Sequence, residues 1–508
     1  MPQFQYSRWQ QHIISKALQS RRVLVLAGSR QCGKTTLARA IATDVTVYRT
    51  LDDTTLLAAA LSDPHGFVRH GDNLMIIDEV QKAPVLLPAI KQDVDVQQLP
   101  GRFLLTGSAN IQALPGVSES LAGRIRKIRL RPLAQGEIKG VPAHFLPNAF
   151  AETFLPDSSL QATGEYSLKD RYILLALRGG YPEVVRQSEE REARRWLNDY
   201  LNALLDRDLQ DIINIRRRDS MVLLVEVLAA WSSKFMDIAG IGTGLALARA
   251  TIQTYINALE ALYLVERVRP WTKTDYERVS KQDKLFMTDT GLMAAVLRWR
   301  FDKVRLDGEK NGKLLETFVF TQLAAQRDAQ EDDYQLYHYR DREQREVDFI
   351  VENEDGDLLG IEVKAGSAVS KDSFKHLYWF RDHMAKSKRF VGVVMYTGSM
   401  WCRFGRGCGQ CRLVCCGERN QQRIQAFRNR LKPRILLLKT LQQRQVLLNS
   451  LFHGCITRLN LLRIKQAMVA GKRVQHLTFR PAFRAGQGQC HRVVRQIRNG
   501  ANQIKYRR

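Results

Sequence analysis

Residues 28–35 combine glycine, lysine and threonine at a spacing suited to binding phosphate groups. They read Gly-Ser-Arg-Gln-Cys-Gly-Lys-Thr, a complete G-x-x-x-x-G-K-T loop that directly follows the apolar run 23–27. In such a loop the backbone N–H groups turn toward the phosphates, the lysine reaches the β and γ oxygens, and the threonine hydroxyl can ligate Mg²⁺. The sequence therefore predicts an ATP site between a strand and a helix, with contacts from Gly28, Ser29, Arg30, Gln31, Cys32, Gly33, Lys34, Thr35 and Thr36.

Two carboxylates follow a second buried-strand pattern, at residues 73–79. After a phosphate loop, such a strand predicts that Asp78 holds the Mg²⁺ through water and that Glu79 polarises the water that attacks the γ-phosphate. A third apolar strand, 102–108, ends in the hydroxyl residues Thr106 and Ser108. Either hydroxyl could lie between the two earlier strands and orient that water, or it could cap the following helix.

These motifs resemble those of the AAA+ ATPases. More narrowly, they resemble a prokaryotic family that joins such an ATPase to a restriction-endonuclease-like C-terminal domain of unassigned function, and this likeness covers roughly residues 1–400. The resemblance implies that Arg124, in the segment 118–125, is a γ-phosphate or intersubunit arginine, the alternative being a surface arginine near a turn. It also implies that residues 178–183, Arg-Gly-Gly-Tyr-Pro-Glu, form a lid motif close to the base. A turn without a ligand is the competing interpretation.

A second set of chemically capable residues lies in 280–400. Glu316 sits on an apolar helix pattern, Asp348 opens a strand, and Glu362 and Lys364 alternate on the next strand. Period-two geometry sends Glu362 and Lys364 to one face of that strand. The three carboxylates could bind Mg²⁺ while Lys364 activates water or stabilises phosphate charge. Their order matches the restriction-endonuclease-like pattern of a helix glutamate, an aspartate and E-x-K.

Two classes of function follow from these residues. In the first, ATP hydrolysis regulates or powers Mg²⁺-dependent cleavage of nucleic acid by the C-terminal half. In the second, the protein is an ATP-driven switch whose C-terminal half only binds nucleic acid or a partner protein. The alternative for the carboxylates themselves is a set of structural salt bridges with nearby arginines, namely Arg340, Arg342 and Arg345.

The chain is long enough for three or four domains, since it has 508 residues. We expect an α/β protein with a P-loop AAA+ ATPase core (1–165), a helical lid or linker (166–220), a winged-helix-like part (221–275) and a restriction-endonuclease-like α/β domain (276–400). The prospective recognition helix of the winged-helix-like part, residues 250–257, offers few positive charges. DNA reading and a structural or protein-contacting role therefore both stay open for it.

Composition and charge narrow the expected partners. The sequence is 44% hydrophobic and 26% charged, which is ordinary for a globular protein, and it lacks a run of 18 apolar residues or a signal-peptide pattern at its start. These features predict a cytoplasmic protein with no membrane partner. The remaining expected partners are ATP, DNA or RNA, and further copies of the chain in a homo-oligomer.

Residues 401–508 differ abruptly from the rest of the chain. They hold 24 of the 78 Lys and Arg residues but one of the 52 Asp and Glu residues, so 54 basic and 51 acidic residues remain in 1–400 and the net charge there is +3. Seven of the eight cysteines also lie in this tail. The break predicts a frameshifted, poorly packed tail. The alternatives are a phosphate-binding basic arm and a zinc site of Cys408, Cys411, Cys415 and Cys416.

Overall fold

The computed structural model describes residues 6–107, 123–153, 166–208, 218–245, 247–274, 282–386, 388–398 and 408–412. All of these residues belong to one compact unit of the chain, residues 1–420. Ser108, most of the segment 118–125 and the tail from residue 413 on lie outside the described residues. The predictions of a frameshift, a basic arm and a zinc site for that tail stay predictions.

The N-terminal part is built around a five-stranded sheet whose neighbouring strands are all parallel. The strand order is β2-β3-β4-β1-β5, so β4 lies between the strand that leads into the phosphate loop and the strand that ends at Asp78. The strands are β1 (Val23–Ala27), β2 (Val47–Thr50), β3 (Met75–Asp78), β4 (Phe103–Gly107) and β5 (Ile125–Arg129). The carboxyl ends of β1, β3 and β4 therefore meet at one edge of the sheet.

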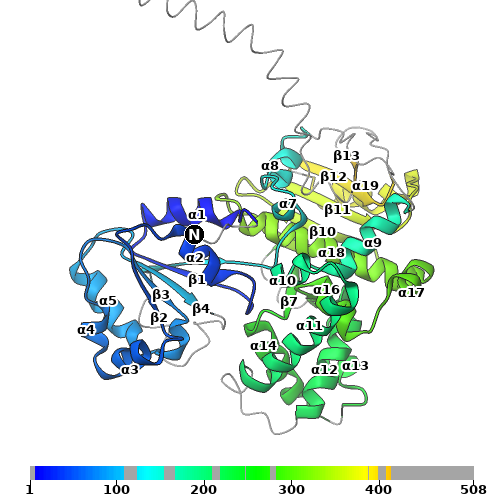
Figure 1. Cartoon of the computed structure of the whole chain (residues 1–508). Coiled ribbons are helices and arrows are strands. Elements are labelled where there is room, and N and C mark those ends of the chain that lie inside the picture. Colours follow the sequence, from blue (N-terminus) through cyan, green and yellow to red (C-terminus); the bar gives the residue numbers. More distant parts are fainter. Residues whose placement is uncertain are drawn as a thin grey trace, which may run out of the picture. The chain divides into compact units, whose positions relative to one another are not determined.

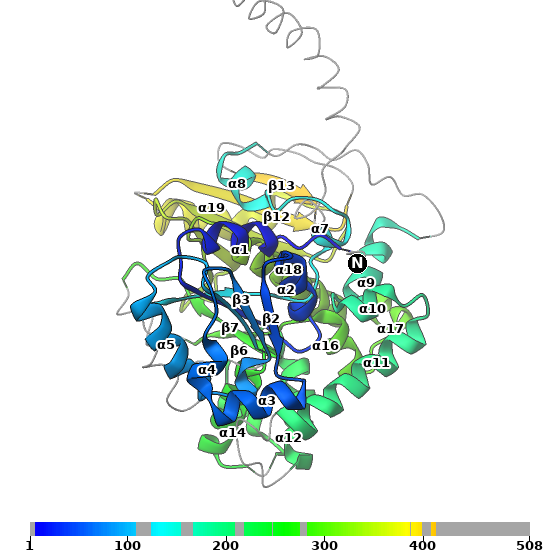
Figure 2. The same ribbon diagram turned by 60° about the vertical axis from the view of Figure 1, so that its left-hand side comes forward.

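Helices cover both faces of this sheet, which explains why its central strands are apolar on both sides. One face packs on α1 (Gln10–Leu18) and α2 (Lys34–Ile41), and the other on α4 (Pro64–Val68) and α5 (Leu86–Val96), as Figures 1 and 2 show. The shorter elements of this part are α3 (Thr54–Ser62), the 3₁₀ turn η1 (Val80–Lys82), α7 (Gln135–Ile138) and α8 (Phe145–Phe150).

A helical segment follows, as the sequence predicted for the lid region. It contains α9 (Leu168–Arg178), α10 (Pro182–Arg186), α11 (Glu190–Ala203) and a π-helical turn η3 (Leu204–Asp208). The predicted winged-helix-like part shows the order helix, strand, helix, helix, strand, strand: α12 (Arg218–Trp231), β6 (Lys234–Phe235), α13 (Ile238–Gly242), α14 (Arg249–Ala261), β7 (Val265–Pro270) and β8 (Lys284–Met287). Its last strand lies beyond the predicted limit at residue 275.

The C-terminal described part shares one sheet with the preceding segment. The strand order is β13-β12-β11-β10-β9-β7-β8-β6, and β7 pairs with β9 at its end. The added strands are β9 (Gln335–Arg340), β10 (Glu346–Glu352), β11 (Leu358–Lys364), β12 (Phe390–Tyr396) and β13 (Cys408–Arg412). Because β13 pairs with β12, ordered pairing continues past residue 400, where the sequence predicted the packed part to end.

Two helices flank this second sheet on opposite faces. The long helix α18 (Gly308–Asp328) packs against one face, and α19 (Lys375–His383) against the other (Figure 1). The remaining elements are α16 (Thr290–Val296), α17 (Phe301–Leu306) and the 3₁₀ turn η4 (Lys371–Phe374). Among the described residues, no helix has the length and apolar character needed to span a membrane.

Candidate functional site

The phosphate loop has the backbone conformation that its glycines permit. Gly33 caps α2 with φ 101°, in the left-handed region that a side chain disfavours. A Cβ atom at Gly28 would lie 2.0 Å from the carbonyl oxygen of Leu130, so a larger residue there would push the loop off β5. The loop therefore turns tightly from β1 into the amino end of α2, where free N–H groups favour an anion.

Lys34 and Thr35 begin α2 and face different partners. The Lys34 ammonium donates to the carbonyl oxygens of Gly28 (3.1 Å) and Ser29 (2.9 Å), so it rests against its own loop. The Thr35 hydroxyl donates to the carboxylate of Asp78 at 3.0 and 3.1 Å. The structure thus brings together the threonine and the aspartate that the sequence predicted as Mg²⁺ partners.

Hydroxyl groups surround the buried carboxylate of Asp78. The hydroxyl of Thr106, at the end of β4, donates a hydrogen bond to Oδ1 of Asp78 and accepts one from the backbone N–H of Glu79 at 3.1 Å. Tyr48 on β2 donates to Oδ2 at 2.9 Å, and burial raises the pKa of Tyr48 to about 12. Of the two hydroxyl residues predicted to lie between the strands, Thr106 does so, while Ser108 lies outside the described residues.

Glu79 has an unusual backbone conformation for a non-glycine residue. Its φ is 59° and its ψ is 44°, in the left-handed region. Such a conformation costs about 1–2 kcal/mol and is found at functional sites. The side chain of Gln81 donates to Oε2 of Glu79, which fixes the carboxylate beside the end of β3.

Arg8 supports the back of the phosphate loop, and no sequence motif singles it out. Its guanidinium donates to the carbonyl oxygens of Cys32 (2.7 Å) and Arg131 (2.6 Å) and to Glu137 at 2.8 Å. The Arg8 side chain is buried, so these three hydrogen bonds replace the contacts with water that its guanidinium would otherwise make. An isolated arginine before the first strand carries no motif, and its role is visible only from the contacts.

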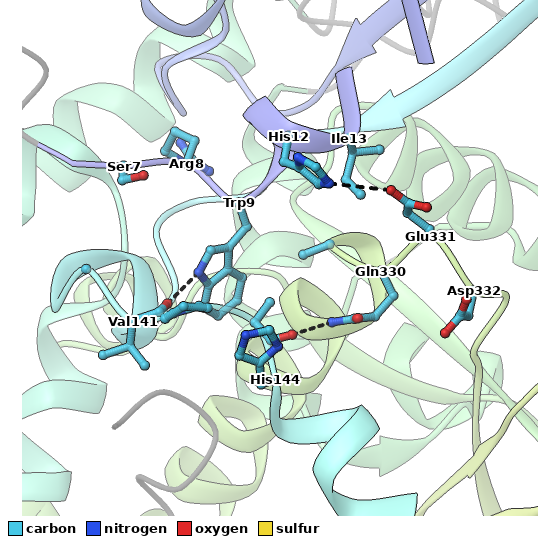
Figure 3. Close-up of a pocket in the computed structure, with 14 residues that line it drawn as sticks. Ser7, Arg8, Trp9, His12, Ile13, Val141, His144, Gln330, Glu331 and Asp332 are labelled. Carbon is cyan, nitrogen blue, oxygen red and sulfur yellow. Dashed lines mark hydrogen bonds and ion pairs between the residues drawn. The ribbon is translucent and has the colours of Figure 1, made fainter. Parts of the chain in front are cut away.

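A cavity of about 550 Å³ is lined in part by Arg8 and by none of the residues 28–36. Figure 3 shows Trp9 and His144 on its wall, with the Trp9 indole donating to the carbonyl oxygen of Val141 at 2.7 Å. His12 pairs with Glu331 across its rim at 3.6 Å. The cavity therefore adjoins the support of the phosphate loop without being part of the predicted triphosphate site.

The predicted lid motif is a tight turn that touches the phosphate loop region. Gly180 donates to the carboxylate of Asp289 at 2.7 Å and accepts the N–H of Leu133 at 2.6 Å. The hydroxyl of Tyr200, on α11, donates to the carbonyl oxygen of Arg30 at 3.2 Å. Burial raises the pKa of Asp289 to about 6, even though backbone N–H groups oppose that rise. Because the hydroxyl of Tyr181 in the turn donates to the hydroxyl of Tyr200 at 3.1 Å, the turn connects the loop to the segment after β8.

Arg124 lies away from the other predicted residues of the triphosphate site. It immediately precedes β5, whose first residue is the partner of Val23, so it is at the amino edge of the parallel sheet. There it donates to both carboxylate oxygens of Asp95, at 2.5 and 3.1 Å. Because the phosphate loop is at the carboxyl edge, Arg124 does not lie beside the loop of its own chain, and the γ-phosphate role that the resemblance implied stays a prediction. An intersubunit role stays a prediction.

The carboxylates of the C-terminal half gather around a lysine that the sequence interpretation missed. Lys284 on β8 is 1% exposed, and its ammonium lies 2.6 Å from Glu316, 2.6 Å from Glu346 and 3.8 Å from Asp348. A register shift between Val347 and Ile350 locally re-aims the strand that carries Asp348. A signal was present, because Lys284 begins an otherwise apolar strand, where a buried cation needs acidic partners.

Glu362 and Lys364 form a second ion pair beside this group. Their side chains are 3.1 Å apart, and Oε1 of Glu362 is buried without a hydrogen-bond partner. Asp348 connects the two groups, since its Oδ2 accepts the backbone N–H of Val363 at 2.8 Å while its Oδ1 faces Lys284. The predicted residues are therefore close together, but as two linked ion-pair groups.

Burial and mutual repulsion shift the protonation of this cluster. Burial raises the pKa of Glu316 to about 8, with Lys284 opposing the rise and Asp348 adding to it. Burial and then Asp348 raise the pKa of Glu362 well above its ordinary value. For Lys284, burial disfavours the ammonium, but Glu316, Asp348 and Glu346 outweigh burial and raise its pKa.

The predicted Mg²⁺ site of Glu316, Asp348 and Glu362 does not fit this arrangement. Within the described ranges, no three His, Cys, Asp or Glu residues are placed so that they could hold a metal ion. The physical reason is the Lys284 ammonium, which lies among the carboxylates where a cation would be coordinated. The described geometry is that of a salt-bridge network.

Comparisons with solved structures give loose similarities. The chain aligns with AMPPCP-bound DnaA from Aquifex aeolicus at a TM-score of 0.25 and 14% identity, over 49% of this chain and 86% of that one. It aligns with the RuvB Holliday junction branch migration motor of Thermotoga maritima at a TM-score of 0.24 and 18% identity, over 53% and 93%. TM-scores this low give no ground for transferring a function.

Comparisons of the sequence give closer matches than the comparisons with solved structures. Uncharacterized proteins of Mycobacterium tuberculosis (Rv2008c) and Mycobacterium bovis (Mb2031c) are each 29% identical over 360 residues, which is 70% of this chain and 73% of theirs. Residues 169–303 and 311–422 match two family models described as domains of unknown function, DUF8612 and DUF4143. Residues 20–139 match the family model described as an AAA domain. The N-terminal part of this chain therefore carries an AAA+ ATPase-like domain.

Proposed function

We propose that the protein binds ATP at residues 28–36 and hydrolyses it. The observation that carries this proposal is the contact between the Thr35 hydroxyl and the Asp78 carboxylate at 3.0 and 3.1 Å, which joins the start of α2 to the end of β3. Glu79 follows Asp78 directly and is held in place by Thr106. These contacts support a role for Thr35 and Asp78 as a cation-binding pair and for Glu79 as the water-polarising carboxylate.

The residues at this edge suit Mg²⁺, because a hydroxyl and a carboxylate are the hard oxygen ligands that Mg²⁺ prefers. Thr35 and Asp78 would hold it, and when bound it would neutralise charge on the phosphate oxygens. The Lys34 ammonium leaves the carbonyl oxygens of Gly28 and Ser29 and turns to the β and γ oxygens. Glu79 accepts a hydrogen bond from the attacking water and thereby orients and polarises it.

Two substitutions test this function. Lys34→Ala is expected to abolish binding of a fluorescent ATP analogue, because the loop loses its cation. Glu79→Gln is expected to keep binding and to lower kcat about 10²-fold or more, because only the water-polarising group is lost. Lys82→Gln, at an exposed lysine three residues away, is the matched control and should leave both unchanged. Equal hydrolysis by wild type and Glu79→Gln would refute the assignment.

We further propose that nucleotide binding acts on the C-terminal half. Contacts run from the loop through Arg8 to the backbone of Arg131, whose guanidinium pairs with Glu266 on β7 and Asp328 at the end of α18. This continuous set of buried polar contacts favours an ATP-driven switch. Hydrogen exchange of α18 with and without a non-hydrolysable ATP analogue tests it, and identical exchange in wild type would contradict it.

What the C-terminal half acts on is a separate question. Nucleic acid, either cleaved with Mg²⁺ or only bound, and a partner protein are the candidates, and the salt-bridge geometry around Lys284 favours binding without cleavage. Incubation of the full chain with single- and double-stranded DNA and RNA, with Mg²⁺ and with or without ATP, separates these outcomes. A homo-oligomer is proposed as well, because Arg124 lies at the amino edge of the sheet, where an intersubunit role would bring it to the triphosphate of a neighbouring copy.

A further inference from the structure

Lys284 is a buried cation without a place in ATP turnover. Its ammonium is close to three carboxylates from two elements, Glu316 on α18 and Glu346 and Asp348 on β10. The rings of Phe235 and Phe286 lie 5.4 and 6.0 Å from the same nitrogen, so aromatic faces complete its surroundings. The ammonium donates a hydrogen bond to Glu346 at 2.6 Å and lies within ion-pair distance of the other two carboxylates.

A divalent cation and this ammonium compete for the same oxygens. Mg²⁺ and Mn²⁺ require carboxylate oxygens close around one point, and the Lys284 nitrogen already lies 2.6 Å from two of them. Bringing a second cation into a buried space beside the first would add repulsion that the low-dielectric surroundings screen poorly. The only way to admit a metal ion here is to remove or displace the lysine.

We propose that Lys284 takes the place of a divalent cation in the Glu316–Glu346–Asp348 cluster, so that the C-terminal half of this protein binds no Mg²⁺ or Mn²⁺ there. The inference is independent of ATP hydrolysis, because the cluster and the phosphate loop share no residue. It also gives the cluster a defined role: the lysine, on β8, ties Glu316 of α18 to Glu346 of β10 and so holds the helix against the face of the second sheet, as a structural metal ion would.

The test is Mn²⁺ binding by the full chain, in an Asp78→Asn background that weakens the cation site of the ATPase part. The nucleotide-free protein is titrated with Mn²⁺ and free Mn²⁺ is followed by electron paramagnetic resonance. The protein that retains Lys284 is expected to show no stoichiometric binding of Mn²⁺. Lys284→Ala vacates the space of the ammonium and keeps the carboxylates of Glu316, Glu346 and Asp348. This variant is expected to bind one Mn²⁺ per chain. Adding Asp348→Asn to Lys284→Ala should weaken that binding about tenfold or more.

Thermal unfolding gives a second readout that does not require Lys284→Ala to be stable by itself. Because a ligand that binds only the folded state stabilises it, Mn²⁺ should raise the melting temperature of Lys284→Ala and leave that of the Lys284 protein unchanged. Lys273→Ala, at an exposed lysine, is the control and should respond like wild type. One Mn²⁺ bound by the Lys284 protein and lost on Asp348→Asn would overturn the proposal. The proposal would also be overturned if Lys284→Ala bound no Mn²⁺ and its melting temperature did not change when Mn²⁺ was added.

Discussion

The hydroxyl of Thr106 accepts the backbone N–H of Glu79 at 3.1 Å and donates to the carboxylate of Asp78. One buried side chain on β4 therefore fixes both acidic residues at the end of β3. This contact depends on the strand order, which makes β3 and β4 parallel neighbours. It also identifies Thr106 as a positioning residue of the triphosphate site.

Replacing Thr106 by Val should slow ATP hydrolysis about 10–100-fold, the range typical when a group that orients a ligating or catalytic side chain is lost. The shape of the side chain is kept, so nucleotide affinity should change much less than kcat. Thr106→Ser keeps the hydroxyl and is the control that should stay near wild type. Steady-state kinetics of the three proteins check this, and a Val variant as active as the Ser variant would contradict it.

Glu79→Gly should make the protein more stable while abolishing turnover. Glycine adopts φ 59° without the steric cost that Glu79 bears, so a gain of about 1 kcal/mol is expected. Glu79→Gln retains the β-carbon and should show no such gain, which separates backbone strain from charge. The comparison is made on thermal midpoints, and equal midpoints for the two variants would show that the strain is not present in solution.

Asp289 should make stability depend on pH between about 4 and 6. Its pKa rises from 3.8 to about 6 on folding, so the folded protein binds a proton that the unfolded chain has released at pH 5. The resulting contribution, about 3 kcal/mol at most, is fully present below pH 4 and is lost as the pH rises through 6. Unfolding by urea at several pH values should show this fall in wild type and not in Asp289→Asn.

Arg131→Met should destabilise the protein by about 3–5 kcal/mol, because it leaves Glu266 and Asp328 buried with fewer cations. Both carboxylates bond to the Arg131 guanidinium at 2.6–3.0 Å, and its side chain is 4% exposed. Arg267→Met removes a half-buried arginine from the same strand as Glu266 and should cost far less. Thermal midpoints that fall equally in the two variants would contradict this role for Arg131.

The closeness of Thr35 and Asp78 could be predicted from the sequence because the motifs that carry them are local. The phosphate loop and Asp78 each follow a short buried strand, and parallel strands bring their carboxyl ends together. Arg8 and Tyr48 could not be predicted in the same way, since nothing in their neighbourhood shows what they contact in space. The position of Arg124 at the amino edge was likewise not predictable from its motif, because it follows from the register of β5.

The C-terminal cluster shows a different limit. The order of Glu316, Asp348, Glu362 and Lys364 correctly predicted that they lie near one another. It could not reveal Lys284, because that residue comes from a strand that joins the sheet through β7 and not from the motif itself. Whether acidic residues bind a metal ion depends on every cation within reach, and this includes residues far away in the sequence.

The helix α18 has one further mechanical consequence. It carries Glu316 beside Lys284 and ends at Asp328 beside Arg131, and these two residues are separated by about 18 Å of continuous helix. A rod of that length converts a tilt of about 5° at one end into a shift of about 1.5 Å at the other. Such a displacement is large compared with a 2.6 Å ion-pair distance, so in the proposed switch a small tilt of α18 at its Asp328 end would open or tighten the cluster around Lys284.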